Sequence, residues 1–191
     1  MPVETEIKLR LPDGARRACA LLEQHGFREA SPRQLESDQA FDLPNAELRH
    51  GDRLLRLRSA AGRWIVTYKG PAFEDLSGAG GRKNREEIEA EVLDGPAFAA
   101  ILNALGYHPS FSYEKFRTTF QAPGDAGIVT LDETPIGDFL ELEGPGYWID
   151  QTAGRLGFDA DDYITLSYAA LYHQYCQEQA TVPGDMKFPA P

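Results

Sequence analysis

The first stretch of the chain, residues 3–11, carries charged side chains at alternate positions. Glu4 and Glu6 are followed by Lys8 and Arg10, with apolar residues or threonine between them. Side chains of a β-strand alternate between its two faces, so all four charged groups fall on one face. On an open antiparallel sheet that face would meet water. On an enclosed face, Glu4 and Glu6 need a positive partner, because two carboxylates about 4 Å apart repel by roughly 4 kcal/mol at an effective dielectric near 20.

The alternation recurs along the chain, which favours an enclosed polar face over a plain surface. Some expected strands carry two carboxylates at positions i and i+2, others carry two cations, and the opposite parity is apolar. The further members of this charged parity are Arg56, Arg58, Lys69, Arg85, Glu87, Glu89, Lys115, Arg117, Asp132, Glu141 and Glu143.

Segregated pairs of this kind are suited to binding a metal and a chain of phosphates. Clusters with oxygen donors only suit Mg²⁺ or Mn²⁺, and these ions commonly bridge to substrate phosphates. Arginine matches phosphate oxygens in a bidentate geometry. Closing about eight antiparallel strands into a barrel would turn every charged face toward one lumen and leave the apolar exterior to helices. The residues alone therefore indicate a polyphosphate clamp inside a barrel, and an open sheet with a solvated face is the alternative.

The elements that position these residues follow from hydrophobic periodicity and from turn signals. We expect one domain over residues 1–180 and a flexible C-terminal tail over residues 181–191, which are rich in proline. Strands are expected at 3–11, 38–42, 53–59, 63–69, 85–92, 112–121, 128–133 and 139–143, and helices are expected after Gly14, from Asp94 to Leu105, up to Leu156, and from Ser167 past Tyr175.

Composition excludes several classes of protein. The 191 residues have a formal net charge of -11, which argues against a nucleic-acid partner. No apolar run approaches the ~20 residues of a membrane span, and the N-terminus lacks a signal pattern, so we expect a cytoplasmic protein with no membrane partner. Cys19 and Cys176 fall in expected helices far apart in the chain, which indicates ordinary thiols rather than a disulfide framework. The four histidines are scattered, which disfavours a zinc site.

Taken in order, the charged motifs resemble those of the CYTH family, the triphosphate tunnel metalloenzymes named for class IV adenylyl cyclases and thiamine triphosphatases. Each motif is weak alone, but their common order covers nearly the whole chain, from Val3 to about Tyr172. The motifs are Glu4-x-Glu6-x-Lys8, Leu55-Arg56-Leu57-Arg58, Thr67-Tyr68-Lys69-Gly70-Pro71, Arg85-x-Glu87-x-Glu89, Glu114-Lys115-x-Arg117, Leu131-Asp132, Gly137-x-Phe139-x-Glu141-x-Glu143 and Ser167-Tyr168.

The resemblance implies an α+β fold: a closed eight-stranded antiparallel β-barrel, or tunnel, with a charged lumen and flanking helices. It also implies three groups of site residues: metal ligands, triphosphate ligands, and a pair for a second metal or for charge balance. Three members of these groups, Glu4, Glu6 and Lys8, would be catalytic. The metal, Mg²⁺ or Mn²⁺, would be held by Glu4, Glu6, Asp132, Glu141 and Glu143; the triphosphate would be gripped by Lys8, Arg56, Arg58, Lys69, Arg85, Lys115 and Arg117; and Glu87 and Glu89 would touch a second metal or balance the arginines.

Two reactions use the same clamp, so the resemblance leaves the reaction open. Water attacking the terminal phosphorus gives a triphosphatase, whereas a ribose hydroxyl attacking the α-phosphorus gives an adenylyl cyclase that releases pyrophosphate. We favour hydrolysis of tripolyphosphate, thiamine triphosphate or a nucleotide for three reasons. The His-Phe element that often precedes Glu-x-Glu-x-Lys in class IV cyclases has no room before Glu4. Ala40 stands where the family has tyrosine, and the parity of Trp64 places its ring under a helix rather than on a purine.

A non-catalytic sensor of polyphosphate or nucleotide stays open as a hypothesis from another class. The carboxylate pairs argue against it, because a pure binder could use lysine and arginine alone. The expected partner is a small-molecule triphosphate, and the protein is expected to be a monomer or a homodimer.

Overall fold

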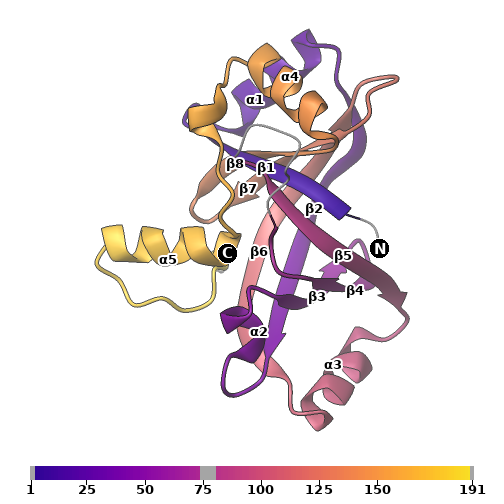
Figure 1. The fold of residues 1–191 in the computed structure, drawn as a ribbon, viewed down its shortest axis with the longest axis vertical. Helices are drawn as coiled ribbons and strands as arrows, with labels where there is room; N and C mark the ends of the chain where they lie inside the picture. Colours follow the sequence, from indigo (N-terminus) through magenta and orange to yellow (C-terminus); the bar gives the residue numbers. More distant parts are fainter. Residues whose placement is uncertain (1–2, 74–80, 190–191) are drawn as a thin grey trace.

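The computed structural model describes residues 3–73 and 81–189. In it, eight antiparallel strands close into one barrel in the order β1-β5-β4-β3-β2-β6-β7-β8 (Figure 1), which confirms the predicted fold class. The strands are β1 (Val3–Leu11), β2 (Arg28–Asp42), β3 (Leu54–Ala60), β4 (Arg63–Lys69), β5 (Lys83–Val92), β6 (His108–Gln121), β7 (Ile128–Thr134) and β8 (Gly137–Glu143).

The first strand closes the barrel, because it pairs on one side with β5 and on the other with β8. Glu4 lies opposite Arg85 of β5, and Lys8 lies opposite Glu141 of β8. Residues paired across neighbouring strands share a face, so the charged parity of each strand turns toward the same side. A closed barrel leaves no sheet edge unpaired.

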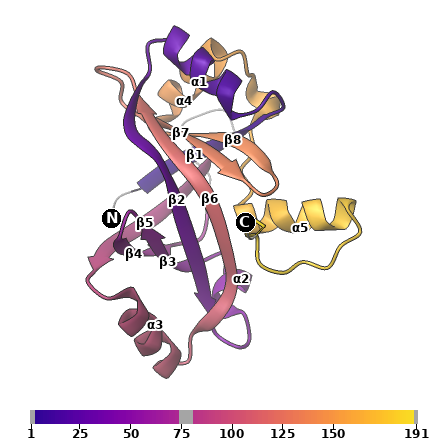
Figure 2. The ribbon, with the colours of Figure 1, turned by 180° about the vertical axis from the view of Figure 1, so that it is seen from behind.

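The second strand is much longer than predicted. The sequence indicated a strand at 38–42, whereas β2 has 15 residues and runs with the long β6 diagonally across the barrel (Figure 2). Its register with β6 shifts between Glu29 and Ser31, and again between Ser31 and Gln34. Such irregularities break the period of two, and Pro32 lies within this part of the strand, so the usual strand pattern is absent there.

Two helices cover the barrel around β1, β7 and β8: α1 (Ala15–Gln24) and α4 (Gly146–Arg155) (Figure 1). Leu22 of α1 and Ile149 of α4 are fully buried against the apolar parity of these strands, which includes Ile7 and Leu140. This is the largest apolar cluster of the described residues, and it fixes β1 and β8 next to each other.

The helix α3 (Gly95–Ala104) packs on β3 and β4 at the other end of the molecule. The Asp94 side chain caps it by accepting a hydrogen bond of 2.9 Å from the backbone N–H of Ala97. Phe98 and Leu102 cluster with Trp64 of β4, whose ring leaves no room for a side chain at Gly95. The prediction that Trp64 lies under a helix is confirmed.

A short helix that the sequence analysis did not predict, α2 (Glu47–His50), follows β2. Its four residues are too few for a detectable hydrophobic period. The Asp42 carboxylate holds the start of this helix by accepting hydrogen bonds from the N–H groups of Leu48 and Arg49 at 2.9 and 3.0 Å.

After a 3₁₀ turn (Ala160–Asp162), α5 (Tyr168–Glu178) begins at its predicted cap, Ser167.

The segment after α5, for which the sequence indicated a flexible tail, returns to β6. Met186 is fully buried, its N–H donates to the Ser112 carbonyl at 3.0 Å, and its carbonyl accepts from the N–H of Glu114 at 2.9 Å.

Both cysteines lie in helices as free thiols, as predicted. None of the helices in the described part of the chain is long and apolar enough to cross a membrane.

Candidate active site

The barrel holds a cavity of about 1630 Å³ lined by inward-facing side chains. Every predicted site residue lines it except Asp132, which lies behind the lining. The predicted residues that line the cavity are Glu4, Glu6, Lys8, Arg56, Arg58, Lys69, Arg85, Glu87, Glu89, Lys115, Arg117, Glu141 and Glu143. The structure therefore brings together groups that are spread over 140 residues of sequence.

Four cations on β3 and β6 form what we call the cation wall: Arg56, Arg58, Lys115 and Arg117. Each one contacts a buried carboxylate. Arg58 donates to Asp38 at 2.8 Å and lies 3.0 Å from Glu36, while Arg56 lies 3.4 Å from Asp38. Asp38 is 1% exposed; burial alone would raise its pKa, but Arg58 and Arg56 hold it below the usual value.

Asp132 supports the other half of the cation wall. Its carboxylate is 0% exposed and accepts hydrogen bonds from Lys115 and from the hydroxyl of Tyr168, each at 2.7 Å. Arg117 binds both of its oxygens, at 2.7 and 2.6 Å. Burial opposes the charge, yet Arg117 and Lys115 keep the pKa of Asp132 below its ordinary value, while burial and Asp132 raise the pKa of Tyr168 well above its own.

Lys8 and Glu141 connect the cation wall to β1. The Lys8 ammonium lies 3.1 Å from Glu141 and 3.5 Å from Glu6, and Glu141 also contacts Arg117. Burial would lower the pKa of Lys8, but Glu141 and Glu6 raise it. Burial would raise the pKa of Glu141, but Lys8 and Arg117 hold it well below its usual range. Both groups are therefore charged at neutral pH.

A different balance holds at the acidic wall, which we define as Glu4, Glu6, Glu87 and Glu143. Lys69 contacts Glu4 and lies 3.4 Å from Glu87, so one ammonium serves two carboxylates. Glu143 lies opposite Glu6 on the neighbouring strand. Burial of its carboxyl, and then the nearby Glu4, raise the pKa of Glu143 to about 7 even though part of the side chain is exposed. Burial and a hydrogen bond with Glu4 raise the pKa of Glu87 to about 8.

The acidic wall has the donor chemistry for a hard divalent cation, because it offers oxygen ligands only and, among the described residues, its four carboxyl groups have only Lys8 and Lys69 within ion-pair distance. The side chains are not gathered for this purpose: among the described residues, no three acidic, histidine or cysteine groups converge on one point. Glu4 and Glu6 of β1 and Glu143 of β8 lie on neighbouring strands and could supply oxygen ligands to such an ion. The oxygens of Asp132 are already taken by two cations and a hydroxyl, and Glu141 is held by Lys8 and Arg117.

Glu89, the remaining predicted acid, lies at the margin of the site. Its carboxylate accepts a 2.7 Å hydrogen bond from the Thr67 hydroxyl and is 3.5 Å from Arg56, and its side chain is 48% exposed. This placement suits a charge partner of Arg56.

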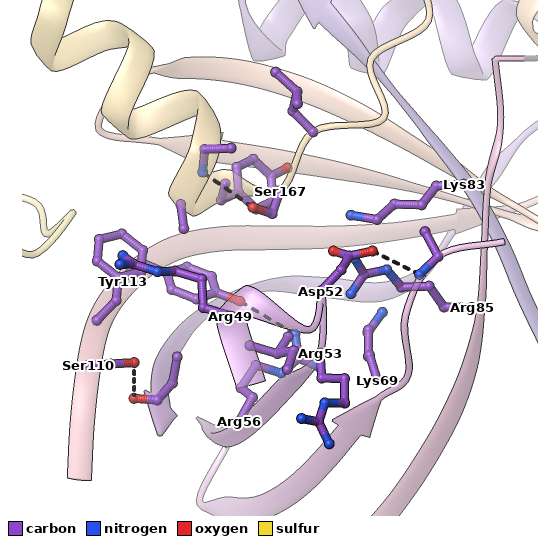
Figure 3. Close-up of a pocket in the computed structure, with 18 of the residues that line it drawn as sticks. Arg49, Asp52, Arg53, Arg56, Lys69, Lys83, Arg85, Ser110, Tyr113 and Ser167 are labelled. Carbon is purple, nitrogen blue, oxygen red and sulfur yellow. Dashed lines mark hydrogen bonds and ion pairs between the residues drawn. The ribbon is translucent and has the colours of Figure 1, made fainter. Parts of the chain in front are cut away.

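A second group of cations lies where the cavity opens beside α2 and the N-terminal ends of β3 and β5. We call Arg49, Arg53, Lys83 and Arg85 the basic mouth (Figure 3). Asp52 contacts Arg85, and Arg53 lies 3.4 Å from Glu47. Burial, and then the neighbouring Arg85, lower the pKa of Lys83 to about 8.

Several of these residues were not identified from the sequence. Glu36 and Asp38 neutralise the cation wall, and their i, i+2 spacing opposite Arg58 is the signal that could have found them. The sequence analysis includes Tyr168 in a motif but assigns no role to its side chain. The members of the basic mouth other than Arg85 carry no local signal, because a loop, a short helix and a strand bring them together.

Comparisons with known proteins agree with this architecture. A model of the CYTH domain family matches residues 2–147. Over 141 residues the chain is 30% identical to a Methanocaldococcus jannaschii protein named "Putative adenylate cyclase". The matched region covers 74% of this chain and 76% of that relative.

Solved structures share the fold at lower identity. A Vibrio parahaemolyticus protein named "putative adenylate cyclase" superposes with a TM-score of 0.74 at 20% identity, over 88% of this chain and 96% of the other. A Hippeastrum protein, described as an adenylyl cyclase homologue with a dominant triphosphatase activity, superposes with a TM-score of 0.61 at 15% identity, over 96% and 98% of the two chains.

Proposed function

Because this chain belongs to the CYTH domain family, we propose that it is a divalent-metal-dependent phosphohydrolase that acts on a triphosphate bound in the barrel. One observation carries the proposal: an ordered wall of four cations faces the same cavity as a wall of incompletely neutralised carboxylates. The first wall suits phosphate oxygens, and the second suits a cation that accompanies them.

The cation wall would bind and orient the phosphates. Phosphoryl transfer depends on positioning and charge stabilisation more than on covalent chemistry. Arg58 and Arg117 are fixed by bidentate or paired contacts to buried acids, so their donors need little reorganisation when charge develops on the phosphate. Lys8, held charged by Glu141, would add a third point of contact from β1.

The acidic wall would hold Mg²⁺ or Mn²⁺ through Glu4, Glu6 and Glu143. When bound, such an ion neutralises phosphate charge and lowers the pKa of a water molecule. Lys69, which contacts Glu4, would neutralise part of the charge of the acidic wall. Asp132 and Glu141, assigned to the metal by family resemblance, have contacts that favour a role in positioning the cations.

Adenylyl cyclase activity is the second candidate, because the relative of 30% identity carries that name. The same clamp would hold ATP, and the reaction would differ in its nucleophile. Against it, Trp64 is packed under α3 and does not line the cavity, and Ala40 places only a methyl group at the lining.

The test is one set of assays with one protein. Purified protein with Mg²⁺ or Mn²⁺, and the same protein with EDTA, is offered tripolyphosphate, thiamine triphosphate and ATP separately. Orthophosphate that appears only with metal and without cyclic AMP supports the proposal. Cyclic AMP and pyrophosphate from ATP would replace it with the cyclase, and tight binding of tripolyphosphate without turnover would indicate a sensor.

A further inference from the structure

Arg56 differs from the other members of the cation wall in how its guanidinium is held. The other three cations donate hydrogen bonds to buried carboxylates, whereas Arg56 donates none to a carboxylate in the described part of the chain. Its Nη2 donates instead to the hydroxyl of Thr67 at 3.0 Å. A neutral oxygen can fix a guanidinium without neutralising it, so Arg56 keeps more of its charge for a ligand.

A row of residues across four strands places Thr67 beside Arg56. Arg56 of β3 lies opposite Thr67 of β4, and Thr67 in turn lies opposite Glu89 of β5. On the other side of Arg56, Ala40 of β2 has no hydrogen-bonding side chain. Residues directly opposite each other on one face of an antiparallel sheet are close enough for their side chains to interact. Within this row, polar support therefore reaches the guanidinium from the side of Thr67 only.

The hydroxyl of Thr67 serves two charged groups at once. It accepts the hydrogen bond from Nη2 of Arg56, and it donates to Oε1 of Glu89 at 2.7 Å. A hydroxyl has one proton to donate, so the bond to Glu89 leaves the oxygen lone pairs for Arg56. Thr67 is 0% exposed and is not among the described residues that line the cavity. Its side chain can therefore affect a ligand only through its neighbours.

Glu89 is the competing partner for Arg56. Its Oε1 lies 3.5 Å from Nη2, and its side chain is 48% exposed, so little packing opposes a shift toward the guanidinium. A direct hydrogen bond between the two charged groups would have a length of about 2.7–2.9 Å and roughly twice the strength of a neutral one. Such a pair would draw the guanidinium to the margin of the cavity and neutralise it there. The Thr67 hydroxyl binds both groups and opposes this direct contact.

We propose that Thr67 is a positioning residue, whose hydroxyl holds the guanidinium of Arg56 toward the phosphates and keeps Glu89 from pairing with it. The proposal rests on the proposed function, because that function needs the cation wall to bind phosphate. Tyr113 of β6 supports the same group, since its hydroxyl accepts from Nη1 of Arg56 at 3.5 Å (Figure 3). Two neutral oxygens thus accept the hydrogen bonds of this one arginine.

The experiment measures the affinity for tripolyphosphate by calorimetry, with the intact protein in EDTA so that neither metal nor turnover contributes. Thr67→Val removes the hydroxyl and keeps the branched shape, Thr67→Ala repeats the deletion with a smaller side chain, and Thr67→Ser keeps the hydroxyl. Glu89→Gln is measured alone and together with Thr67→Val. The matched control is Thr134→Val, which deletes another buried hydroxyl, one that donates to the Gly137 carbonyl at 2.6 Å.

Thr67→Val should weaken binding by roughly tenfold, the order that a hydrogen bond to a charged group contributes. Thr67→Ser should bind nearly as the wild type does. Glu89→Gln should recover most of the loss in the Thr67→Val background and change the wild-type affinity much less, and a purely structural role would not produce this coupling. Thr134→Val should keep the wild-type affinity even where its melting temperature falls.

Three results would overturn the proposal: wild-type affinity in both Thr67→Val and Thr67→Ala, a loss in Thr67→Ser as large as in Thr67→Val, or an equal effect of Glu89→Gln in the two backgrounds. Turnover with metal separates this proposal from the proposed function. If tripolyphosphate is not hydrolysed but the pattern of affinities holds, hydrolysis is wrong and the role of Thr67 stands. If it is hydrolysed and Thr67→Val binds as the wild type does, the role of Thr67 is wrong and hydrolysis stands.

Discussion

The cation wall and the acidic wall face the same cavity but are stabilised in opposite ways. On the cation wall, Arg58, Lys115 and Arg117 each have a buried carboxylate at hydrogen-bond or ion-pair distance, and the pKa values of Asp38 and Asp132 are lowered. On the acidic wall, Glu87 and Glu143 have raised pKa values, while Lys8 and Lys69 lower the pKa of Glu6 against its burial. The protein itself neutralises the cation wall, whereas it neutralises the acidic wall only in part.

This difference indicates which half of the site is complete in the protein alone. Fixed donors lose little free energy when they meet a developing charge. Crowded carboxylates instead repel one another in the metal-free protein, and a bound cation relieves that repulsion. We expect changes in the cation wall to alter stability first, and changes in the acidic wall to alter metal-dependent activity first.

The largest effect should come from removing the acid at the centre of the cation wall. Asp132→Ala leaves Lys115, Arg117 and the hydroxyl of Tyr168 buried without their shared partner. Breaking a buried ion pair from one side typically costs about 3–5 kcal/mol, so the free energy of unfolding should fall by that amount. Urea denaturation measures it, with exposed Asp161→Asn as the control. A loss no larger than that of the control would mean that this wall is not preorganised by Asp132.

The matching change on the acidic wall should reduce metal-dependent activity and leave the stability of the apo protein intact. Glu143→Gln removes a carboxylate that Glu4 and Glu6 repel, and no cation lies within ion-pair distance of it among the described residues. Metal-dependent turnover should fall by roughly 100-fold, a typical loss for a group that stabilises developing charge, while the apo melting temperature stays or rises.

Initial rates and thermal melts of the same preparation test this pair of outcomes, with Glu178→Gln on α5 as the matched control. A clear drop in apo stability would assign Glu143 a structural role instead.

A smaller change tests whether the cation wall depends on α5. Tyr168→Phe keeps the ring against Phe139 but removes the hydroxyl that donates to Asp132. A hydrogen bond to a charged group contributes about 1.5–3 kcal/mol, so the variant should lose less stability than Asp132→Ala. Chemical denaturation beside Tyr175→Phe, a change on the exposed part of α5, measures the difference. Equal losses in the two variants would show that the hydroxyl adds nothing.

The remaining expected effect is the pH dependence of apo stability. In the unfolded chain Glu87 and Glu143 titrate near 4.5, whereas in the folded protein their pKa values are about 8 and about 7. The folded state then binds more protons between these values, so stability from these groups declines as pH rises from about 4.5 to about 8. Thermal melts across this range check it. Glu87→Gln should flatten the slope, and a steeper slope in that variant would contradict the assignment.

Much of the barrel could be predicted because the period of two is a local property of strands. The shared charged parity of β1, β3 and β8, and with it the common face of Glu4, Arg56 and Glu141, follows from alternation, whereas the inward direction of that face depends on closure of the barrel. The first half of β2 could not be predicted, because register shifts and Pro32 interrupt the alternation. The four residues of α2 are too short to show a period.

The partners inside the lumen depend on contacts between distant residues and not on local pattern. The sequence shows that Asp132 has lumen parity, but only the barrel shows that it is shared by Arg117, Lys115 and Tyr168 from two other elements. The same holds for the basic mouth, where Asp52 joins Arg85 across 33 positions of sequence.

The position of β1 between β5 and β8 also has a consequence during translation. Within the barrel β1 is synthesised first, and one of its two edges pairs with β8, whose last residue is Glu143. The barrel therefore cannot close until β8 has been synthesised, and such distant pairings form late. Until then one face of the nascent sheet presents glutamate, lysine and arginine to water, and charged side chains of this kind oppose pairing between the open edges of neighbouring nascent chains.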